Sequence, residues 1–284
     1  MAAATNYVYC ASYHQMVEIF QNIRKIYTFR QPCEELTPHI EFYSESSFEA
    51  TRQHIAGESF SVKMFPSWTP TFYINLGAPY YITLGDTRYF IGADEDILIL
   101  RNCTVERYNT PADNIFTVKF HPGGLEAVLG IKQTALQDKV VNLHKILPAT
   151  LLQKLKWQQT FEERIQLVQN YFLMHYRRQP DHYLKFVNDA IDAYAHTGFQ
   201  FKNAQLAEKL FATSKTINQY FHNVVGTSPK NYFSIMRTRM ALTGYVNRNE
   251  QFIPFEYGYY DMSHFYKDVV KFTGQRLVEH SEVF

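Results

Sequence analysis

The sequence predicts an α+β protein in two parts: a β-rich, barrel- or sandwich-like domain with trailing helices over residues 1–180, and an all-α domain over residues 183–284. Three observations support this prediction. Short aromatic and β-branched runs lie between Gly and Pro turns in residues 60–120, helical periodicity follows residue 160, and a helical segment near the C-terminus repeats at an offset of 48 residues. A chain of 284 residues is long enough for two domains.

Five segments of the front part are predicted to be strands, because each is rich in the residue types that fit a pleated surface. Gly77, the Gly85-Asp86 pair and Pro111 lie between them and favour turns. The predicted strands are residues 60–65, 71–76, 80–84, 97–100 and 115–120. Their spacing is typical of a small barrel or sandwich.

Helices are predicted after the strands. Thr160 and Glu163 form a capping box, in which a hydroxyl and a carboxylate satisfy the end of the first helical turn. Ile165, Val168 and Phe172 follow on one face of that helix. Residues 177–181 (Arg-Arg-Gln-Pro-Asp) end it and are the predicted linker, after which every element is expected to be helical.

Composition and charge limit the partners. Three widely spaced cysteines form no CxxC pair, which fits a reducing cytosol and predicts a cytoplasmic protein. No apolar run reaches the roughly 18 residues that cross a bilayer, so no membrane partner is expected. The net charge is +1, yet residues 202–276 carry ten basic and five acidic side chains. That excess is compatible with nucleic acid without requiring it.

Patterns of catalytic or metal chemistry are missing from the sequence. It contains no HxH, HExxH, GxSxG or P-loop motif. His121 precedes Pro122 and two glycines, where a structural role in a turn is favoured over a ligand pocket. Core packing is likewise favoured over a pocket for four strand tyrosines: Tyr73, Tyr80, Tyr81 and Tyr89. We therefore expect no metal, no cofactor and no enzymatic activity.

The repeated segment consists of two helices of the same design. Each begins with a good N-cap, Thr213 or Asp261. In the first copy the inward face is expected to hold Ile217, Tyr220, Phe221 and Val224. The side chains left facing outward are Lys215, Thr216, Asn218, Gln219 and His222 in the first copy, and Ser263, His264 and Lys267 in the second. A single polar face is usually just solvated, but two such helices can enter successive major grooves of DNA.

The residues of this region resemble the DNA-binding domain of AraC/XylS regulators. Leu206-Ala207 through Thr213, then Ile217, Phe221, Gly226, Ser228-Pro229, Tyr232, Arg237 and Ala241 are similar to the first helix-turn-helix unit and the connecting helix. Gly258-Tyr259-Tyr260-Asp261, Ser263-His264-Phe265 and Lys271-Phe272-Thr273-Gly274 resemble the second unit. The resemblance covers residues 183–284 and implies two helix-turn-helix units joined by a long helix.

The front part adds a weaker resemblance to one branch of the same family. Residues 120–130 (Phe-His-Pro-Gly-Gly-Leu-Glu-Ala-Val-Leu-Gly) are similar to a turn at the end of its sensor-like domain, and residues 31–40 fit the opening of that domain. This match implies no particular ligand.

Departures from the family pattern fall mostly in the second unit. Phe211 stands where the first turn usually has Gly, so we expect a longer or differently packed turn. Pro254 stands where a small residue is usual and is expected to delay or distort its helix. Val270 replaces a Lys that would contact phosphate, and Gln219 replaces a common Arg. We expect the first unit to read sequence and the second to bind more weakly.

The resemblance implies a transcription regulator, with activation the favoured sign, that binds double-stranded DNA. It also implies contact with RNA polymerase and a possible small-molecule effector. A homodimer is expected to form through the front domain, because its aromatic strands and the helix of residues 160–176 offer apolar surface. The predicted DNA-binding residues are Lys215, Thr216, Asn218, Gln219, Ser263, His264 and Lys267, while Arg237 and Arg239 could fix packing or touch phosphate. Two alternatives remain: a protein-interaction or antagonist module that no longer reads DNA well, and a small-molecule-binding or enzymatic barrel with an added helical domain.

Overall fold

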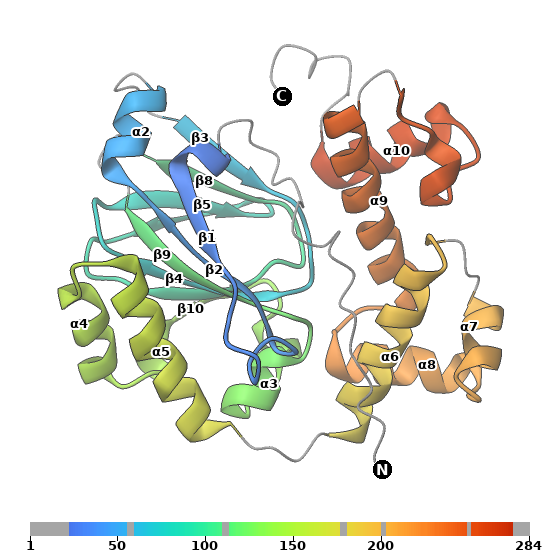
Figure 1. The fold of residues 1–284 in the computed structure, drawn as a ribbon, viewed down its shortest axis with the longest axis horizontal. Coiled ribbons are helices and arrows are strands. Elements are labelled where there is room, and N and C mark those ends of the chain that lie inside the picture. The colour runs from blue at the N-terminus through green and yellow to red at the C-terminus, as the bar shows by residue number, and fades with distance from the viewer. Residues whose placement is uncertain are drawn as a thin grey trace.

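The computed structural model describes residues 23–55, 60–109, 114–176, 181–199, 203–248 and 251–274. It confirms the predicted α+β class, because all ten strands within these ranges lie before residue 143 and only helices follow residue 149. The two parts lie side by side, with the sheets in one and the last five α-helices in the other (Figure 1).

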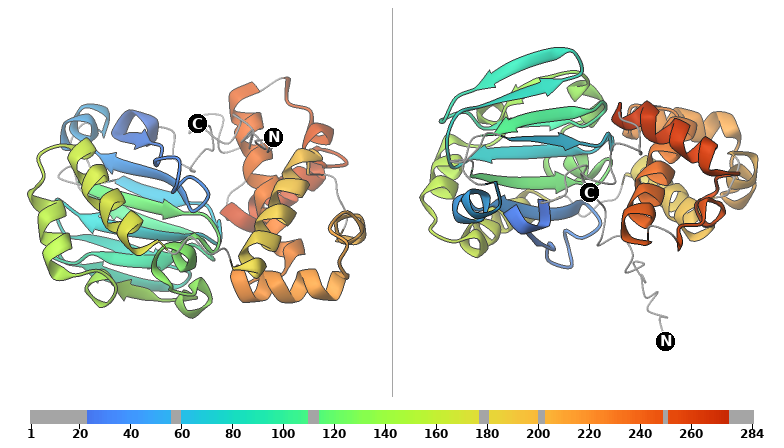
Figure 2. Two further views of the ribbon diagram at one scale, coloured as in Figure 1. Left: turned by 60° about the horizontal axis from the view of Figure 1, so that its bottom comes forward. Right: turned by 90° about the horizontal axis from the view of Figure 1, so that it is seen from above.

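The front part consists of two antiparallel sheets, which Figure 2 shows from two further directions. The larger sheet has six strands in the order β1 (Tyr27–Arg30), β2 (Ile40–Ser46), β9 (Ile115–Phe120), β4 (Pro70–Asn75), β7 (Ile97–Leu100) and β10 (Val140–Asn142). The smaller sheet has four strands in the order β3 (Phe60–Met64), β8 (Val105–Asn109), β5 (Tyr80–Leu84) and β6 (Thr87–Ile91).

The central strands of the larger sheet are buried on both faces. Tyr73 and Ile99 belong to a core between the two sheets, whereas Phe72 and Phe116 belong to a second core on the opposite face. Helices cover that second face (Figure 1). They are α3 (Gly124–Leu129), α4 (Ala149–Trp157) and α5 (Phe161–His175). Burial on both faces explains why β4, β7 and β9 are nearly continuous apolar runs.

The predicted capping box begins α5. Thr160 Oγ1 accepts a hydrogen bond from the Glu163 backbone N–H over 3.2 Å, and Glu163 Oε2 accepts one from the Thr160 N–H over 3.0 Å. The remaining short helices of the front part are α1 (Ile23–Ile26), α2 (Phe48–Ile55), η2 (Gln133–Leu136) and η3 (Leu143–Lys145).

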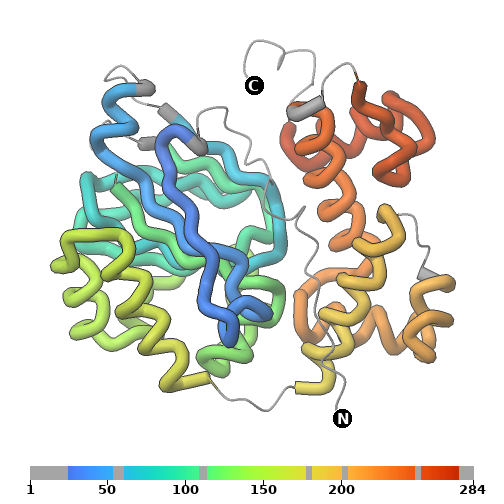
Figure 3. The backbone as a smooth tube through the Cα atoms, viewed as in Figure 1, coloured from blue at the N-terminus to red at the C-terminus, as the bar shows by residue number. Residues whose placement is uncertain are grey.

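The back part is entirely helical in its described residues. The long helix α9 runs between two smaller groups of helices, as the backbone tube shows (Figure 3). In chain order the elements are α6 (His182–His196), α7 (Asn203–Lys209), α8 (Ser214–Val224), α9 (Pro229–Arg248), η5 (Pro254–Tyr257) and α10 (Met262–Thr273). The start of α9 agrees with the sequence, because Ser228 Oγ accepts from the Asn231 N–H and Pro229 is the first helical residue.

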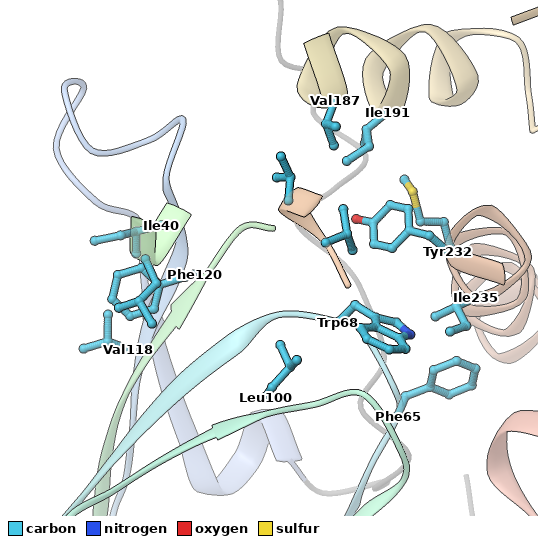
Figure 4. Close-up of a cluster of buried hydrophobic side chains, with 14 of the residues drawn as sticks. Ile40, Phe65, Trp68, Leu100, Val118, Phe120, Val187, Ile191, Tyr232 and Ile235 are labelled. Atoms are coloured by element: carbon cyan, nitrogen blue, oxygen red, sulfur yellow. The ribbon is translucent and has the colours of Figure 1, made fainter. Parts of the chain in front are cut away.

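The two parts share one buried core. Trp68 and Phe65 of the front part face Tyr232 and Ile235 of α9 (Figure 4). Gly123 lies so close to α6 and α8 that a Cβ atom there would come within 2.4 Å of Leu184 Cδ1. The division at residues 180–183 stays a prediction, and residues 177–180 of the proposed linker lie outside the described ranges.

Candidate nucleic-acid interface

The first helix-turn-helix unit consists of α7, a turn and α8. Thr213 caps α8 as predicted, because its Oγ1 accepts a hydrogen bond from the Thr216 N–H over 3.1 Å. Ile217, Phe221 and Val224 are buried, which fixes the inward face of α8. The outward face therefore points away from the core of the back part.

Three of the four predicted contact residues of α8 are exposed: Lys215, Asn218 and Gln219. Thr216 is half-buried, and its hydroxyl oxygen lies 2.9 Å from the Thr213 hydroxyl oxygen. The Thr216 hydroxyl thus belongs to the cap, whereas the amides and the ammonium group are open to solvent. Primary amides and a cation at a helix start are the groups that read base edges and bind phosphate.

The second unit repeats this design with η5 and α10. Asp261 caps α10, because its Oδ1 accepts from the His264 N–H over 2.7 Å. The outward side chains Ser263, His264 and Lys267 are all exposed. The first half of each repeated helix thus carries a capped N-terminus beside exposed polar side chains. Free N–H groups and the helix dipole make such an end favourable for a phosphate.

A hydrogen-bond network fastens the second unit to α9. Asp268 Oδ2 accepts from Arg237 Nη2 over 2.8 Å and from the Tyr259 hydroxyl over 3.2 Å. The Arg237 guanidinium also lies 4.4 Å from the centre of the Tyr259 ring, and the Tyr259 hydroxyl is 2.8 Å from Thr238 Oγ1. Of the two roles that the sequence left open for Arg237, packing is the one its contacts support.

Arg239 lies in the contact between the two parts. Its side chain is buried, and its charge acts on Glu41 of β2. Burial by itself raises the pKa of the Glu41 carboxyl, but Lys119 and Arg239 outweigh burial and hold that pKa below its ordinary value. Arg239 therefore faces the front domain, where it stabilises a carboxylate.

The departures from the family pattern have local structural consequences. Phe211 adopts a left-handed backbone with φ 51°, the conformation that Gly favours, and its side chain is 99% exposed. Pro254 begins a 3-10 helix in place of an α-helical turn, as expected from its missing N–H. The small residue needed for close approach is Gly244 of α9, where a Cβ would come within 2.0 Å of the Tyr257 hydroxyl oxygen.

Histidines and acids do not converge on a metal site in the part of the chain that the structure describes, where no cluster of three potential ligands occurs. The backbone N–H of His121 donates to the His39 carbonyl over 2.8 Å, which joins this turn to the residue before β2. No helix in the described ranges is both long and apolar enough to cross a membrane.

Two contacts of α8 were not predicted. Gln133 of η2 and Gln137, which follows η2, donate from their side-chain amides to the Val225 and Gly226 carbonyls at the end of α8. Neither glutamine belongs to a recognisable motif, so the sequence offered no signal for them. Their role emerges only from the packing of the two parts.

Comparison with solved structures finds proteins of similar fold. ToxT from Vibrio cholerae in an apo variant form has a TM-score of 0.48 at 12% identity, over 80% of this chain and 93% of that one. ToxT bound to an unsaturated fatty acid has a TM-score of 0.45 at 12% identity, over 80% and 91%. The AraC-like transcriptional activator CuxR has a TM-score of 0.27 at 12% identity, over 76% and 86%. No family model and no curated protein matches the sequence.

With identities of 12% and TM-scores below 0.5, the likeness is one of fold. Function is therefore inferred from the geometry of this chain's own two helix-turn-helix units.

Proposed function

We propose that this protein is a sequence-specific, DNA-binding transcription regulator in which α8 and α10 enter two successive major grooves. The first unit reads sequence through Lys215, Asn218 and Gln219, with Thr216 supporting the cap. Ser263, His264 and Lys267 of the second unit bind the neighbouring groove and its phosphates. In this proposal the protein is not an enzyme.

One observation carries the proposal: two helices of the same design, joined by α9, each combine a capped N-terminus with an exposed polar face. A module of this kind can contact two grooves as a monomer, since successive major grooves lie about 34 Å apart along one side of B-DNA. Each outward face is fixed by a buried inward face, so the polar side chains are held in a defined direction.

Selection of bound duplexes from a random pool with the full-length chain tests the proposal. We expect enrichment of a site with two elements one helical turn apart, and an affinity for that site that falls as salt rises. Recovery of unenriched sequences with no salt-dependent binding would contradict it. A chain with Asn218, Gln219 and Lys267 replaced by Ala is the matched negative control.

The proposed effector site lies between the two sheets, in a cavity of about 40 Å³. Three buried cationic side chains line it, Arg101, Arg107 and Lys119. Lys119 is paired with Glu41 over 3.1 Å, so Arg101 and Arg107 carry the excess positive charge of the wall. Such a space holds a few water molecules and is too small for a drug-sized ligand, which needs about 300 Å³ or more. We therefore propose a small anionic effector.

Thermal unfolding in the presence of formate, acetate or phosphate tests the effector proposal. A ligand that binds only the folded state raises the unfolding temperature as its concentration increases. The Arg107→Met variant should lose this response. Equal responses of the two chains would show that the anions act elsewhere.

The homodimer is proposed to form through the helices of the front domain. Trp157 at the end of α4 is 70% exposed, and Leu173 and Met174 on α5 are 37% and 75% exposed. Exposed large apolar side chains on neighbouring surface helices are typical of a protein interface. Sedimentation of the full-length chain should show a dimer that Met174→Glu weakens, whereas Gln166→Glu on the same helix should not.

Activation, RNA polymerase contact and a cytoplasmic location complete the proposal, and the resemblance described above supports all three. A reporter gene carrying the selected site distinguishes activation from repression. Enrichment of RNA polymerase with the wild-type chain on that DNA, and its loss when surface residues outside α8 and α10 are changed, would support the contact.

A second candidate is a protein-interaction or antagonist module. Large apolar side chains beside both units favour it: Phe211 is 99%, Tyr260 90% and Phe255 68% exposed. Such residues suit a protein partner better than a phosphate backbone. Weak DNA binding that is independent of sequence, combined with tight binding of a protein that Phe211→Ala abolishes, would favour this candidate.

A further inference from the structure

The recognition helix of the first unit ends on the front domain. The Val225 carbonyl accepts a hydrogen bond from Gln133 Nε2 over 2.8 Å, and the Gly226 carbonyl accepts one from Gln137 Nε2 over 2.7 Å. Carbonyls at a helix C-terminus have no partner within the helix. Here the side-chain amides of Gln133 in η2 and of Gln137, directly after it, supply those partners, so the end of α8 is bound to the front domain by directional contacts.

Gln133 uses both ends of its amide group. Its Oε1 accepts from the Gly123 N–H over 2.7 Å, while its Nε2 donates to the Trp68 and Val225 carbonyls over 3.0 and 2.8 Å. The side chain is 1% exposed, so water cannot replace these bonds. Gln133 thus connects two loops of the front domain with the end of α8.

The recognition helix of the second unit also ends on the front domain. The Phe272 carbonyl near the end of α10 accepts from Thr104 Oγ1 over 3.1 Å, and the Phe272 ring centre lies 6.0 Å from that of Phe65. Both recognition helices therefore contact the front domain at their C-terminal ends. The capped N-terminal ends, Thr213 and Asp261, are exposed.

One loop joins the two contacts. Residues 65–69 place Phe65 against Phe272 of the second unit, and Trp68 against Gly226 of the first. The loop is fixed by Arg101, whose carbonyl accepts from the Trp68 N–H over 2.9 Å and whose Nη2 donates to the Phe65 carbonyl over 2.8 Å.

We propose that these front-domain residues form a clamp that sets the relative position of α8 and α10, and that Gln133 is its principal positioning residue. The clamp consists of Phe65, Trp68, Thr104, Gln133 and Gln137. This proposal rests on the proposed DNA-binding function. Without the clamp the two units are joined through α9 alone; with it, both helices are fixed to one rigid body.

The clamp predicts that the front domain determines which half-site spacing is read. When two linked units are held at the correct separation, the second binds at a high effective concentration. If that separation varies, the effective concentration of the second unit falls at the correct spacing and rises at the others. Loss of the clamp should therefore reduce discrimination between spacings more than it reduces binding of either half-site.

Gln133→Glu is the direct test, because it keeps the size of the side chain and an acceptor for Gly123. It places a carboxylate oxygen against the two carbonyls that Nε2 now serves, and so breaks the bond to α8. Gln137→Glu, at a part-buried position, is a milder variant should the first fail to fold. Gln166→Glu on the exposed face of α5 is the matched control.

The first measurement is independent of DNA. Spin labels at Gln153 of α4 and Asn223 of α8, both exposed, report the position of the first unit in a chain whose native cysteines are replaced by Ser. Gln133→Glu should broaden this distance distribution, whereas a Gln153–Lys271 pair reporting the second unit should keep its own. Thr104→Val should give the opposite pattern. Unchanged distributions in both variants would overturn the clamp.

The second measurement compares the affinity for the selected duplex with that for duplexes whose half-sites are two base pairs closer or farther apart. We expect the preference of the wild-type chain for one spacing to fall about tenfold in Gln133→Glu and to be unchanged in Gln166→Glu. A higher affinity of Gln133→Glu for every duplex would overturn positioning in favour of inhibition. If the wild-type chain bound no duplex, the proposed function would fail, and the label distances alone would decide whether Gln133 fixes α8.

Discussion

The two helix-turn-helix units have the same design but are stabilised differently. The first depends on the front domain, through Gln133 and Gln137 at the end of α8. The second carries its own lock, in which Asp268 of α10 binds Arg237 and Tyr259. The first unit is therefore positioned mainly by the front domain, whereas the second is held both by α9 and, through Thr104, by the front domain.

Breaking the lock of the second unit should have the largest effect. Asp268→Asn keeps the shape of the side chain but leaves the largely buried Arg237 guanidinium without its carboxylate. Removing one partner of a buried ion pair costs about 3–5 kcal/mol, and a neutral amide recovers part of it, so we expect a loss of about 2–4 kcal/mol. Urea unfolding measures the loss, and hydrogen exchange should locate it in α10.

Asp189→Asn is the control for that change. Its carboxylate pairs with Lys185 over 2.8 Å on α6, but both side chains are about half exposed. Exposed pairs contribute roughly 0.2–1 kcal/mol. Similar losses for the two variants would show that the network around Asp268 does not lock the second unit.

Lowering the pH should destabilise the front domain near the turn that contacts the first unit. His39 lies beneath the turn at Gly124, and burial, together with the nearby His121, lowers the pKa of His39 to about 4. Its ring Nε2 lies 2.9 Å from the Tyr176 hydroxyl. A pKa below the unfolded value of 6.5 means that the unfolded state binds more protons, so stability is complete above pH 6.5 and is lost as pH falls toward 4.

The expected loss from His39 approaches about 1.4 kcal/mol per pH unit within that window, or about 3 kcal/mol in all. Urea unfolding at pH 7 and pH 5 measures it, and Gln in place of His39 should flatten the dependence to the part contributed by His121, whose pKa burial also lowers. A slope identical to that of the wild-type chain would exclude His39 as the titrating group.

Substitutions in the two units should affect DNA binding in different ways. Asn218→Ala or Gln219→Ala should lower discrimination between the selected and a scrambled site by about 1–3 kcal/mol, because a bidentate amide contact to adenine contributes that much. Lys267→Ala should instead weaken binding to all sequences and lower the salt slope by about one. Binding isotherms at several salt concentrations measure both.

His222 on the last turn of α8 is the control for these substitutions, since it is exposed but far along the helix from the capped end. His222→Ala should change neither discrimination nor salt slope. Equal, small effects of all the substitutions would mean that the helices do not read DNA, and the protein-interaction candidate would then be preferred.

The sequence predicted the elements whose pattern is set locally. The caps at Thr160, Thr213 and Asp261 were found because one side chain and the following turn determine them. Strands β4, β7 and β9 were found because burial on both faces makes them continuously apolar. Strands β6 (Thr-Arg-Tyr-Phe-Ile) and β8 (Val-Glu-Arg-Tyr-Asn) were missed, since outward polar residues interrupt their apolar pattern.

Contacts between distant segments could not be predicted. The capping of α8 by Gln133 joins residues 92 positions apart, and an amide in a short 3-10 helix carries no periodic signal. The electrostatic influence of the buried Arg239 on Glu41 was equally hidden, because a cation on a long helix beside a predicted DNA-binding unit is as easily assigned to phosphate. In both cases the contact depends on how one domain packs on the other, and no local sequence pattern encodes that packing.

The smallest predicted effect concerns the turn before α8, where Phe211→Gly should stabilise the chain. A residue other than Gly in the left-handed region costs about 1–2 kcal/mol, and the flexibility that Gly adds to the unfolded chain removes about 0.5–1 kcal/mol of the gain. The 99% exposed side chain loses no packing, so a net increase of about 0.5–1 kcal/mol in unfolding free energy is expected.

Phe211→Ala separates the effect of the backbone from that of the side chain, because it keeps the Cβ and should change stability little. If Ala stabilised the chain as much as Gly, the exposed ring and not the backbone would be the source of the effect. If neither did, the turn before α8 would be unstrained.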